Sequence, residues 1–226
     1  MDVCRARRAS ARKALIATPS PHHYREASAD DVGADVSWQA VCRLLDEVLE
    51  LLKADPVVEG VALIGSLGRG EADNWSDIDL LILMSDQALA QFVDEPAARP
   101  WAQAQLLSDG RHNSPAGATS VGATHIRSGL PFWVDLHVHP ATRTRWPTDG
   151  RIVFEHRPIG TGTLSFDQLN ASGSRQPPTA KTADEIRRIH LSYVPIAGKY
   201  VGRRSPHACN DGHDAVVHTA ARRLLL

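Results

Sequence analysis

Residues 61–83 read VALIGSLGRGEADNWSDIDLLIL, and this stretch decides the fold prediction. Two apolar runs, 57–64 and 78–84, are rich in Val, Ile and Leu and too short for buried helices. Each run therefore predicts a buried strand. The glycine turn at Gly65-Ser66 stops the first strand, and we expect it to open a short helix before the second strand begins.

Two acidic residues open the second predicted strand. Asp77 and Asp79 are two residues apart, so on a strand they project from the same face with Cα atoms about 6.6 Å apart. Ile78 points the other way, into apolar packing. Such carboxylates can converge on a pair of hard cations about 3.5–4 Å apart. Oxygen-only ligands of this kind suit magnesium, which takes its remaining ligands from water and substrate phosphates.

The glycine turn between the two strands has the features of a phosphate site. Gly65 lacks a Cβ, so a ligand can approach its backbone closely. Ser66 can offer its hydroxyl, and the following helix its first N–H groups, to a phosphate. Arg69 can meet phosphate charge. The turn has neither the Gly-Lys-Ser/Thr of a Walker A loop nor a GxGxxG fingerprint.

Together, the Gly-Ser turn and the Asp-x-Asp pair resemble a known signature. GSLGRGEA at 65–72 followed by SDIDL at 76–80 is similar to the polymerase-β-type nucleotidyltransferase superfamily. Within it, the small bacterial branch of minimal nucleotidyltransferases and antibiotic adenylyltransferases is the nearest in pattern. The resemblance implies an α+β fold, in which a small mixed β-sheet with flanking helices is followed by a helical C-terminal region.

The resemblance also implies a third carboxylate on a neighbouring strand, and Asp135 is placed to supply it. In the predicted strand 132–138, Trp133, Asp135 and His137 share one face with His139 by simple alternation. Asp135 either completes the metal site or accepts the proton of the attacking hydroxyl as a general base. His137 is a weaker candidate for that proton.

The activity implied by the resemblance is magnesium-dependent transfer of a nucleoside monophosphate, AMP from ATP, to a hydroxyl of a small molecule, with release of pyrophosphate. Two Mg2+ ions, held by Asp77, Asp79 and Asp135, would bridge the triphosphate, while Gly65 and Ser66 cradle its phosphates. Arg69 and Lys199 are expected to contribute positive charge. An aminoglycoside or lincosamide antibiotic is the first choice of acceptor, by family analogy alone.

Other functions stay open beside this one. Within the superfamily, the acceptor could be a protein or RNA partner, as in toxin–antitoxin systems. Outside it, the chain could be a catalytically silent nucleotide-binding regulatory module. The Asp-x-His-x-His of 135–139 also resembles the first strand of amidohydrolase-type barrels, but such barrels need about 250 residues and only 87 follow His139. An EF-hand at 73–79 lacks its glycine and its glutamate.

Composition narrows the partners. The 226 residues carry 25 Lys+Arg against 26 Asp+Glu, for a formal charge of −1, which argues against nucleic acid as a partner. No apolar run approaches the roughly 18 residues of a membrane helix, so we expect no membrane partner. The three cysteines are odd in number and far apart in the sequence, with no CxxC pair, and this usage predicts a cytoplasmic location. The expected partners are a nucleoside triphosphate and a small-molecule acceptor, and the resemblance also allows a homodimer. A basic segment with Arg143, Arg145, Arg151 and Arg157 could meet the triphosphate.

Changes in the content of Gly, Pro and charged residues along the sequence divide the chain into four predicted parts. We predict a disordered basic tail at 1–30, a nucleotidyltransferase domain at 31–158, a linker at 159–181 and a helical C-terminal domain at 182–226. Helices are expected at 37–53, at 85–107 with breaks near Pro96 and Pro100, at 182–204 with an interruption at Pro195, and at 211–226. Further strands are expected at 122–126, 132–138 and 151–155.

Overall fold

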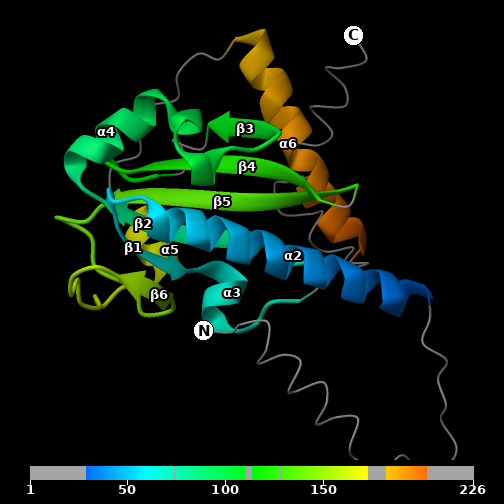
Figure 1. Cartoon of the computed structure of the whole chain (residues 1–226), viewed down its shortest axis with the longest axis horizontal. Coiled ribbons are helices and arrows are strands. Elements are labelled where there is room, and N and C mark those ends of the chain that lie inside the picture. Colours follow the sequence, from blue (N-terminus) through cyan, green and yellow to red (C-terminus); the bar gives the residue numbers. More distant parts are fainter. Residues whose placement is uncertain (1–28, 74, 110–113, 128, 173–181, 203–226) are drawn as a thin grey trace, which may run out of the picture.

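A computed structural model describes residues 29–73, 75–109, 114–127, 129–172 and 182–202. Its centre is a six-stranded sheet in the order β3-β4-β5-β2-β1-β6 (Figure 1). Strands β2 and β5 pair in parallel, and the other neighbours pair antiparallel. This is the mixed sheet that the resemblance to nucleotidyltransferases implies. The strands are β1 (Val58–Leu63), β2 (Ile78–Met84), β3 (Leu106–Asp109), β4 (Thr119–Arg127), β5 (Leu130–Pro140) and β6 (Arg151–Glu155).

One face of the sheet is buried under helices α2 (Ala29–Ala54) and α4 (Asp86–Asp94). Apolar residues of α2 recur every three or four positions, which gives the helix one apolar stripe. That stripe packs against alternate residues of the central strands. Ser85 caps α4, because its Oγ accepts the Ala88 N–H at 3.3 Å. The strand residues buried on this face include Val61 and Leu63 of β1, Ile78, Leu80 and Ile82 of β2, and Val134, Leu136 and Val138 of β5.

The opposite face of the sheet carries the alternate strand residues, whose side chains point away from α2, and other elements cover it. Near β1 and β2 it packs against Trp146, Ile159 and Phe166. Phe166 begins the short helix α5 (Phe166–Ala171), which starts with a capping box between Ser165 and Gln168. Helix α6 (Ala183–Gly202) packs against β3, β4 and β5. Figure 1 shows α2 in front of the sheet and α6 behind it.

The strand predictions hold better than the helix predictions. Strands 78–84 and 151–155 are confirmed to the residue, and the predicted hairpin is confirmed as β4 and β5, both longer than expected. The helix expected over 85–107 is wrong after Asp94. Pro96 and Pro100 instead each begin a 3₁₀ turn, η1 (Pro96–Ala98) and η2 (Pro100–Ala102), because proline suits a first helical turn and removes the N–H a longer helix needs.

In the C-terminal half, the segment 159–181, which we predict to be a linker, contains the short helix α5. Helix α6 is not interrupted at Pro195 but runs through it, held along the sheet by its contacts with three strands. Of the tail predicted at 1–30, residues 1–28 lie outside the described residues, and Ala29 and Asp30 begin α2. The helix predicted at 211–226 also lies outside the described residues, and the division into domains stays a prediction.

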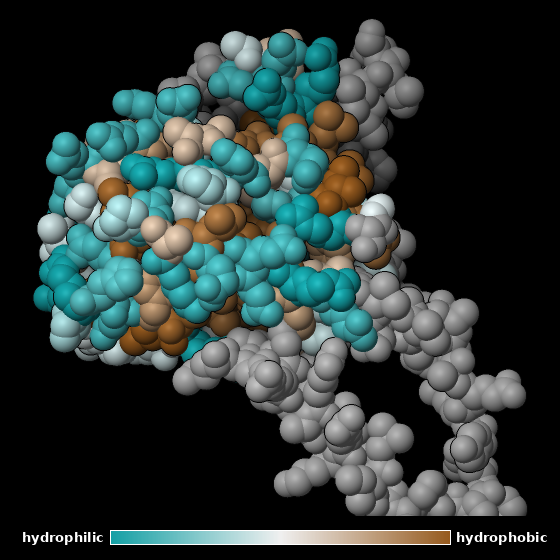
Figure 2. Space-filling view, in the orientation of Figure 1, coloured by the Kyte–Doolittle hydropathy of each residue, from teal (hydrophilic) through white to brown (hydrophobic). Residues whose placement is uncertain are grey.

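The surface in the view of Figure 2 is mostly hydrophilic, with apolar side chains gathered along α6. Leu191 and Val194 of that helix are more than half exposed. Among the described helices, none is both long and apolar enough to span a bilayer.

Candidate active site

The site begins where β1 ends beside the start of β2. The Ile64 N–H donates to the Asp79 carbonyl at 3.0 Å, which fixes the next residue, Gly65, against Asp79. Gly65 has φ +59°, and a Cβ built on it would overlap a carboxylate oxygen of Asp79 and lie 3.0 Å from its Cγ. Only glycine satisfies both the left-handed backbone and this close approach. The structure therefore brings the predicted turn and the predicted acid into direct contact.

Helix α3 (Gly65–Arg69) follows this contact and carries Ser66, which is half-buried, in its first turn. Ile64, the residue before the helix, has no side-chain oxygen to cap it. The first N–H groups of a helix have no acceptor within it. A Cβ on Gly68 would lie 2.6 Å from the Leu63 carbonyl oxygen and 2.9 Å from that of Asp149, so the helix packs tightly against backbone.

Hydrogen bonds among Asp73, Trp75 and Ser76 close a turn directly before Asp77. The Asp73 carboxylate accepts the Trp75 N–H at 3.0 Å and the Ser76 hydroxyl at 2.9 Å. The Ser76 Oγ in turn accepts the Asp73 N–H at 2.8 Å. Sequence reasoning missed Asp73 and Ser76 as positioning residues. Their signal is the spacing of an Asp and a Ser that can close a turn through their side chains.

The two central strands place Asp79 opposite Asp135. Strands β2 and β5 run parallel with these residues in register, so both half-buried side chains project from one face of the sheet. Adjacent strands lie about 4.8 Å apart. On the far side of Asp135, its partner on β4 is Gly122, where a Cβ would overlap the Trp133 ring. The predicted third carboxylate therefore lies on the same face as Asp79.

Asp77, Asp79 and Asp135 suit a divalent ion by the chemistry of their side chains and by the positions of their backbones. Asp77, Asp79 and Asp135 supply carboxylate oxygens alone, the ligands magnesium prefers. In the described part of the chain, no three His, Cys, Asp or Glu side chains converge closely enough to hold an ion as they stand. Binding would therefore require the carboxylates to rotate toward one another, which the strand register allows.

Two histidines lie farther along the same face of β5. The His137 ring packs edge-on against Phe166 at 4.8 Å between ring centres, and His139 is 2% exposed. Burial, with a smaller effect of His139, lowers the pKa of His137 to about 3, and burial lowers the pKa of His139 to about 4. Both rings are neutral at pH 7. His137 and Asp135 share one face of β5, and the choice between them as the proton acceptor stays a prediction.

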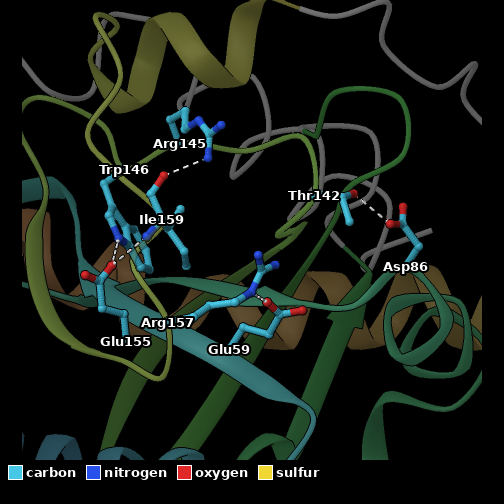
Figure 3. Close-up of polar contacts among 8 residues, drawn as sticks. All are labelled: Glu59, Asp86, Thr142, Arg145, Trp146, Glu155, Arg157 and Ile159. Atoms are coloured by element: carbon cyan, nitrogen blue, oxygen red, sulfur yellow. Dashed lines mark hydrogen bonds and ion pairs between the residues drawn. The ribbon is translucent and has the colours of Figure 1, made fainter.

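The predicted basic residues are mostly engaged elsewhere. The Arg69 Nε donates to Glu71 at 2.8 Å, and this hydrogen bond raises the pKa of the exposed arginine. Arg143 pairs with Asp86 at 3.1 Å. Arg145 donates to the Ile159 carbonyl at 2.7 Å, and Arg157 pairs with Glu59 (Figure 3). Three of the four arginines of the segment 143–157 thus hold loops and strands rather than form an open basic surface. Lys199 lies on α6, and its side chain is outside the described residues.

Residues 41–107 match the family described as nucleotidyltransferase domain. This segment runs from Val41 on α2 through β1, α3, β2 and α4 to the start of β3. It includes Gly65, Ser66, Asp77 and Asp79 but ends before β5 and Asp135. No curated protein sequence matches the chain.

Several solved structures are similar to parts of the chain. A candidate nucleotidyltransferase from Sulfolobus solfataricus is 20% identical over 58% of this chain and 94% of its own, with a TM-score of 0.32. Cid1, described as an RNA terminal uridylyl transferase, is 24% identical over 46% of this chain and 30% of its own, with a TM-score of 0.33. A second Cid1 structure, a poly(U) polymerase with Mg 3'-dATP bound, is 24% identical over 48% and 31%, with a TM-score of 0.30. The chain thus spans under a third of Cid1, and likenesses this low support no conclusion about substrates.

Proposed function

We propose that the protein transfers a nucleoside monophosphate, AMP from ATP, to a hydroxyl group of a small molecule, on the premise that residues 41–107 match the nucleotidyltransferase domain family. The observation that carries the proposal is the register of Asp79 with Asp135 on one face of the parallel strand pair, beside the Gly65 turn. A phosphate-binding turn and carboxylates on one face are the parts that phosphoryl transfer requires.

The proposed metal site consists of Asp77, Asp79 and Asp135. Two bound Mg2+ ions would neutralise the triphosphate and the charge that develops on it. The chain's contribution is to hold the carboxylates in place. Asp77 is fixed by the 73–76 turn, and Asp79 by its backbone bond to Ile64.

In the proposed reaction, the turn at Gly65 and Ser66 receives the β- and γ-phosphates through backbone N–H groups and the serine hydroxyl. The acceptor hydroxyl oxygen forms a bond to the α-phosphorus, and the bond between the α-phosphorus and its bridging oxygen breaks. Pyrophosphate leaves with that oxygen. The hydroxyl proton passes to Asp135, unless this residue serves as a metal ligand and the proton leaves through solvent.

A small acceptor is favoured over a nucleic acid by the charges of the described residues. In the described part of the chain, Arg69, Arg143 and Arg157 are each paired with an acid, so these three side chains are already engaged and less suited to a phosphate backbone. Aminoglycosides and lincosamides are the first acceptors to test, because both carry hydroxyl groups. Homodimer formation stays a prediction.

The test is incubation of the protein with α-labelled ATP, GTP, CTP or UTP, Mg2+, and a panel of hydroxylated antibiotics or cell extract. Label in a small product supports the proposal. Label in a protein or RNA band moves the acceptor to that class, and nucleotide binding without transfer indicates a silent module. The control is Asp77→Asn, which we expect to lower turnover by orders of magnitude with an unchanged circular dichroism spectrum. Unchanged turnover in this variant would refute the metal assignment.

A further inference from the structure

One of the five tryptophans differs from the others in exposure. Trp38, Trp101, Trp133 and Trp146 are between 1% and 8% exposed and belong to packed interiors, whereas Trp75 is 40% exposed. An exposed indole gives up the burial that makes tryptophan favourable in a core, and it leaves a flat aromatic face in contact with solvent. Its position in the chain, directly before the site, makes this exception informative.

Trp75 is held in place although its ring is exposed. The backbone N–H of Trp75 donates to the Asp73 carboxylate at 3.0 Å, and the next residue, Ser76, is buried and donates its hydroxyl to the same carboxylate at 2.9 Å. Asp77 follows immediately. Two residues span at most about 7 Å between Cα atoms, so the backbone of Trp75 is anchored at a distance from which the indole can reach a ligand bound at Asp77.

The same loop carries the phosphate turn at one end and Trp75 at the other. Gly65 and Ser66 follow β1 closely, and Trp75 lies three residues before Ile78, where β2 begins. The acceptor must approach the α-phosphorus from the side opposite the leaving pyrophosphate, which in the proposed reaction is the side of Asp135 on β5. In the proposed reaction the nucleotide extends from the phosphate turn past Asp77, so a ring that binds at Trp75 would belong to the nucleoside and not to the acceptor.

We infer that Trp75 is a binding residue for the nucleotide, whose base stacks on the exposed indole. This inference rests on the proposed function and adds the residue that receives the base. Stacking uses the π-face that every base has, so it raises affinity without reading the base. The contribution of Trp75 to binding affinity should therefore be similar for the four nucleoside triphosphates.

Isothermal titration with ATP and with inorganic tripolyphosphate, each with Mg2+ and without acceptor, separates the base from the phosphates. We expect ATP to bind the wild-type protein more tightly than tripolyphosphate. Trp75→Ala should weaken ATP about 5- to 100-fold and leave tripolyphosphate unchanged, and Trp75→Phe should retain part of the difference. Leu51→Ala is the matched control, because it removes a similarly exposed apolar side chain from α2, on the other face of the sheet.

The outcomes separate the inference from the function on which it rests. Equal ATP affinity in wild type and Trp75→Ala overturns the inference while the proposed function stands. Equal weakening of ATP and tripolyphosphate also overturns it, because Trp75 would then act through the loop and not through the base. A raised KM for the acceptor, with ATP affinity unchanged, would assign the indole to the acceptor instead. If the wild-type protein binds neither ligand, the proposed function and the inference both fail.

Discussion

The carboxylate of Asp79 lies against the backbone of Gly65, so closely that no side chain larger than hydrogen fits between them. The contact joins the end of β1 to the start of β2, and it brings the metal-binding acid and the phosphate turn of the proposed site together. Each of the two residues thus limits what the other position can be. The first prediction follows from this contact.

Gly65→Ala should abolish activity. The new Cβ would overlap the Asp79 carboxylate, and an L-residue at φ +59° costs a further 1–2 kcal/mol or so. We expect turnover to fall at least about 100-fold, since a displacement of about 1 Å can cost that much. Gly70→Ala is the control, because Gly70 has φ +75° but nothing within 4 Å of its Cβ position. This variant should lose similar backbone stability and keep its activity. Equal turnover in the two variants would contradict the role of the contact.

Ser76→Ala should impair catalysis through the position of Asp77. The substitution removes a hydroxyl that donates to the Asp73 carboxylate and accepts the Asp73 backbone N–H. In a buried setting each lost hydrogen bond costs about 1 kcal/mol. We expect urea unfolding to show a loss of about 1–3 kcal/mol. The concentration of Mg2+ needed for half-maximal activity should rise as well. Lost stability with an unchanged Mg2+ requirement would show that the turn supports the fold and does not position Asp77.

Asp135→Asn distinguishes the two roles left open for this residue. If Asp135 is a metal ligand, the Mg2+ requirement should rise and the loss should be partly recovered at high Mg2+. If it is the general base, kcat should fall about 10²- to 10⁴-fold at every Mg2+ concentration. The increase of kcat with pH that the wild-type protein shows on the acidic side should then be absent in the variant. A variant with wild-type kcat and Mg2+ requirement would remove Asp135 from the site.

Stability should decrease in acid because of buried histidines. Burial lowers the pKa of His139 to about 4, below the 6.5 of an exposed histidine, so the unfolded state binds more protons between these values. The free energy of unfolding therefore falls as pH drops from about 6.5 toward 4, by the order of 3 kcal/mol for a shift of this size. His125, whose pKa burial also lowers to about 4, adds to the effect. His139→Leu should flatten the pH profile of urea unfolding in this range, and an unchanged slope would contradict the assignment.

Asp55→Ala should destabilise the fold without touching the site. The Asp55 carboxylate, 9% exposed, accepts the Trp101 Nε1–H at 2.8 Å and an Arg99 N–H at 3.4 Å. Removal leaves a buried indole N–H unsatisfied, which costs about 1–3 kcal/mol. Thermal unfolding should show this loss, while KM and kcat at 25 °C stay at wild-type values. Altered kinetics in the folded variant would contradict a purely structural role.

Sequence reasoning succeeded where the controlling interactions are local. Strand β2 matches its predicted bounds because a continuous Ile/Leu run between a turn and a capping serine leaves few alternatives. It failed over 95–107, where propensity predicted helix and the prolines and the pairing of β3 with β4 decided otherwise. It also could not find the pairing of Arg143 with Asp86 or of Arg157 with Glu59, because these partners are far apart in the chain.

The sequence by itself determined the Gly-Ser turn, the spacing of Asp77 and Asp79 on one strand face, and the alternation that gives β5 one apolar and one polar face. These follow from backbone geometry, which repeats every two residues in a strand. Only the tertiary structure decided that β5 lies beside β2, in parallel, with Asp135 opposite Asp79. A shift of one residue in that register would turn Asp135 to the other face of the sheet. The packing of α2 against alternate residues of both strands buries one face and so excludes the shift.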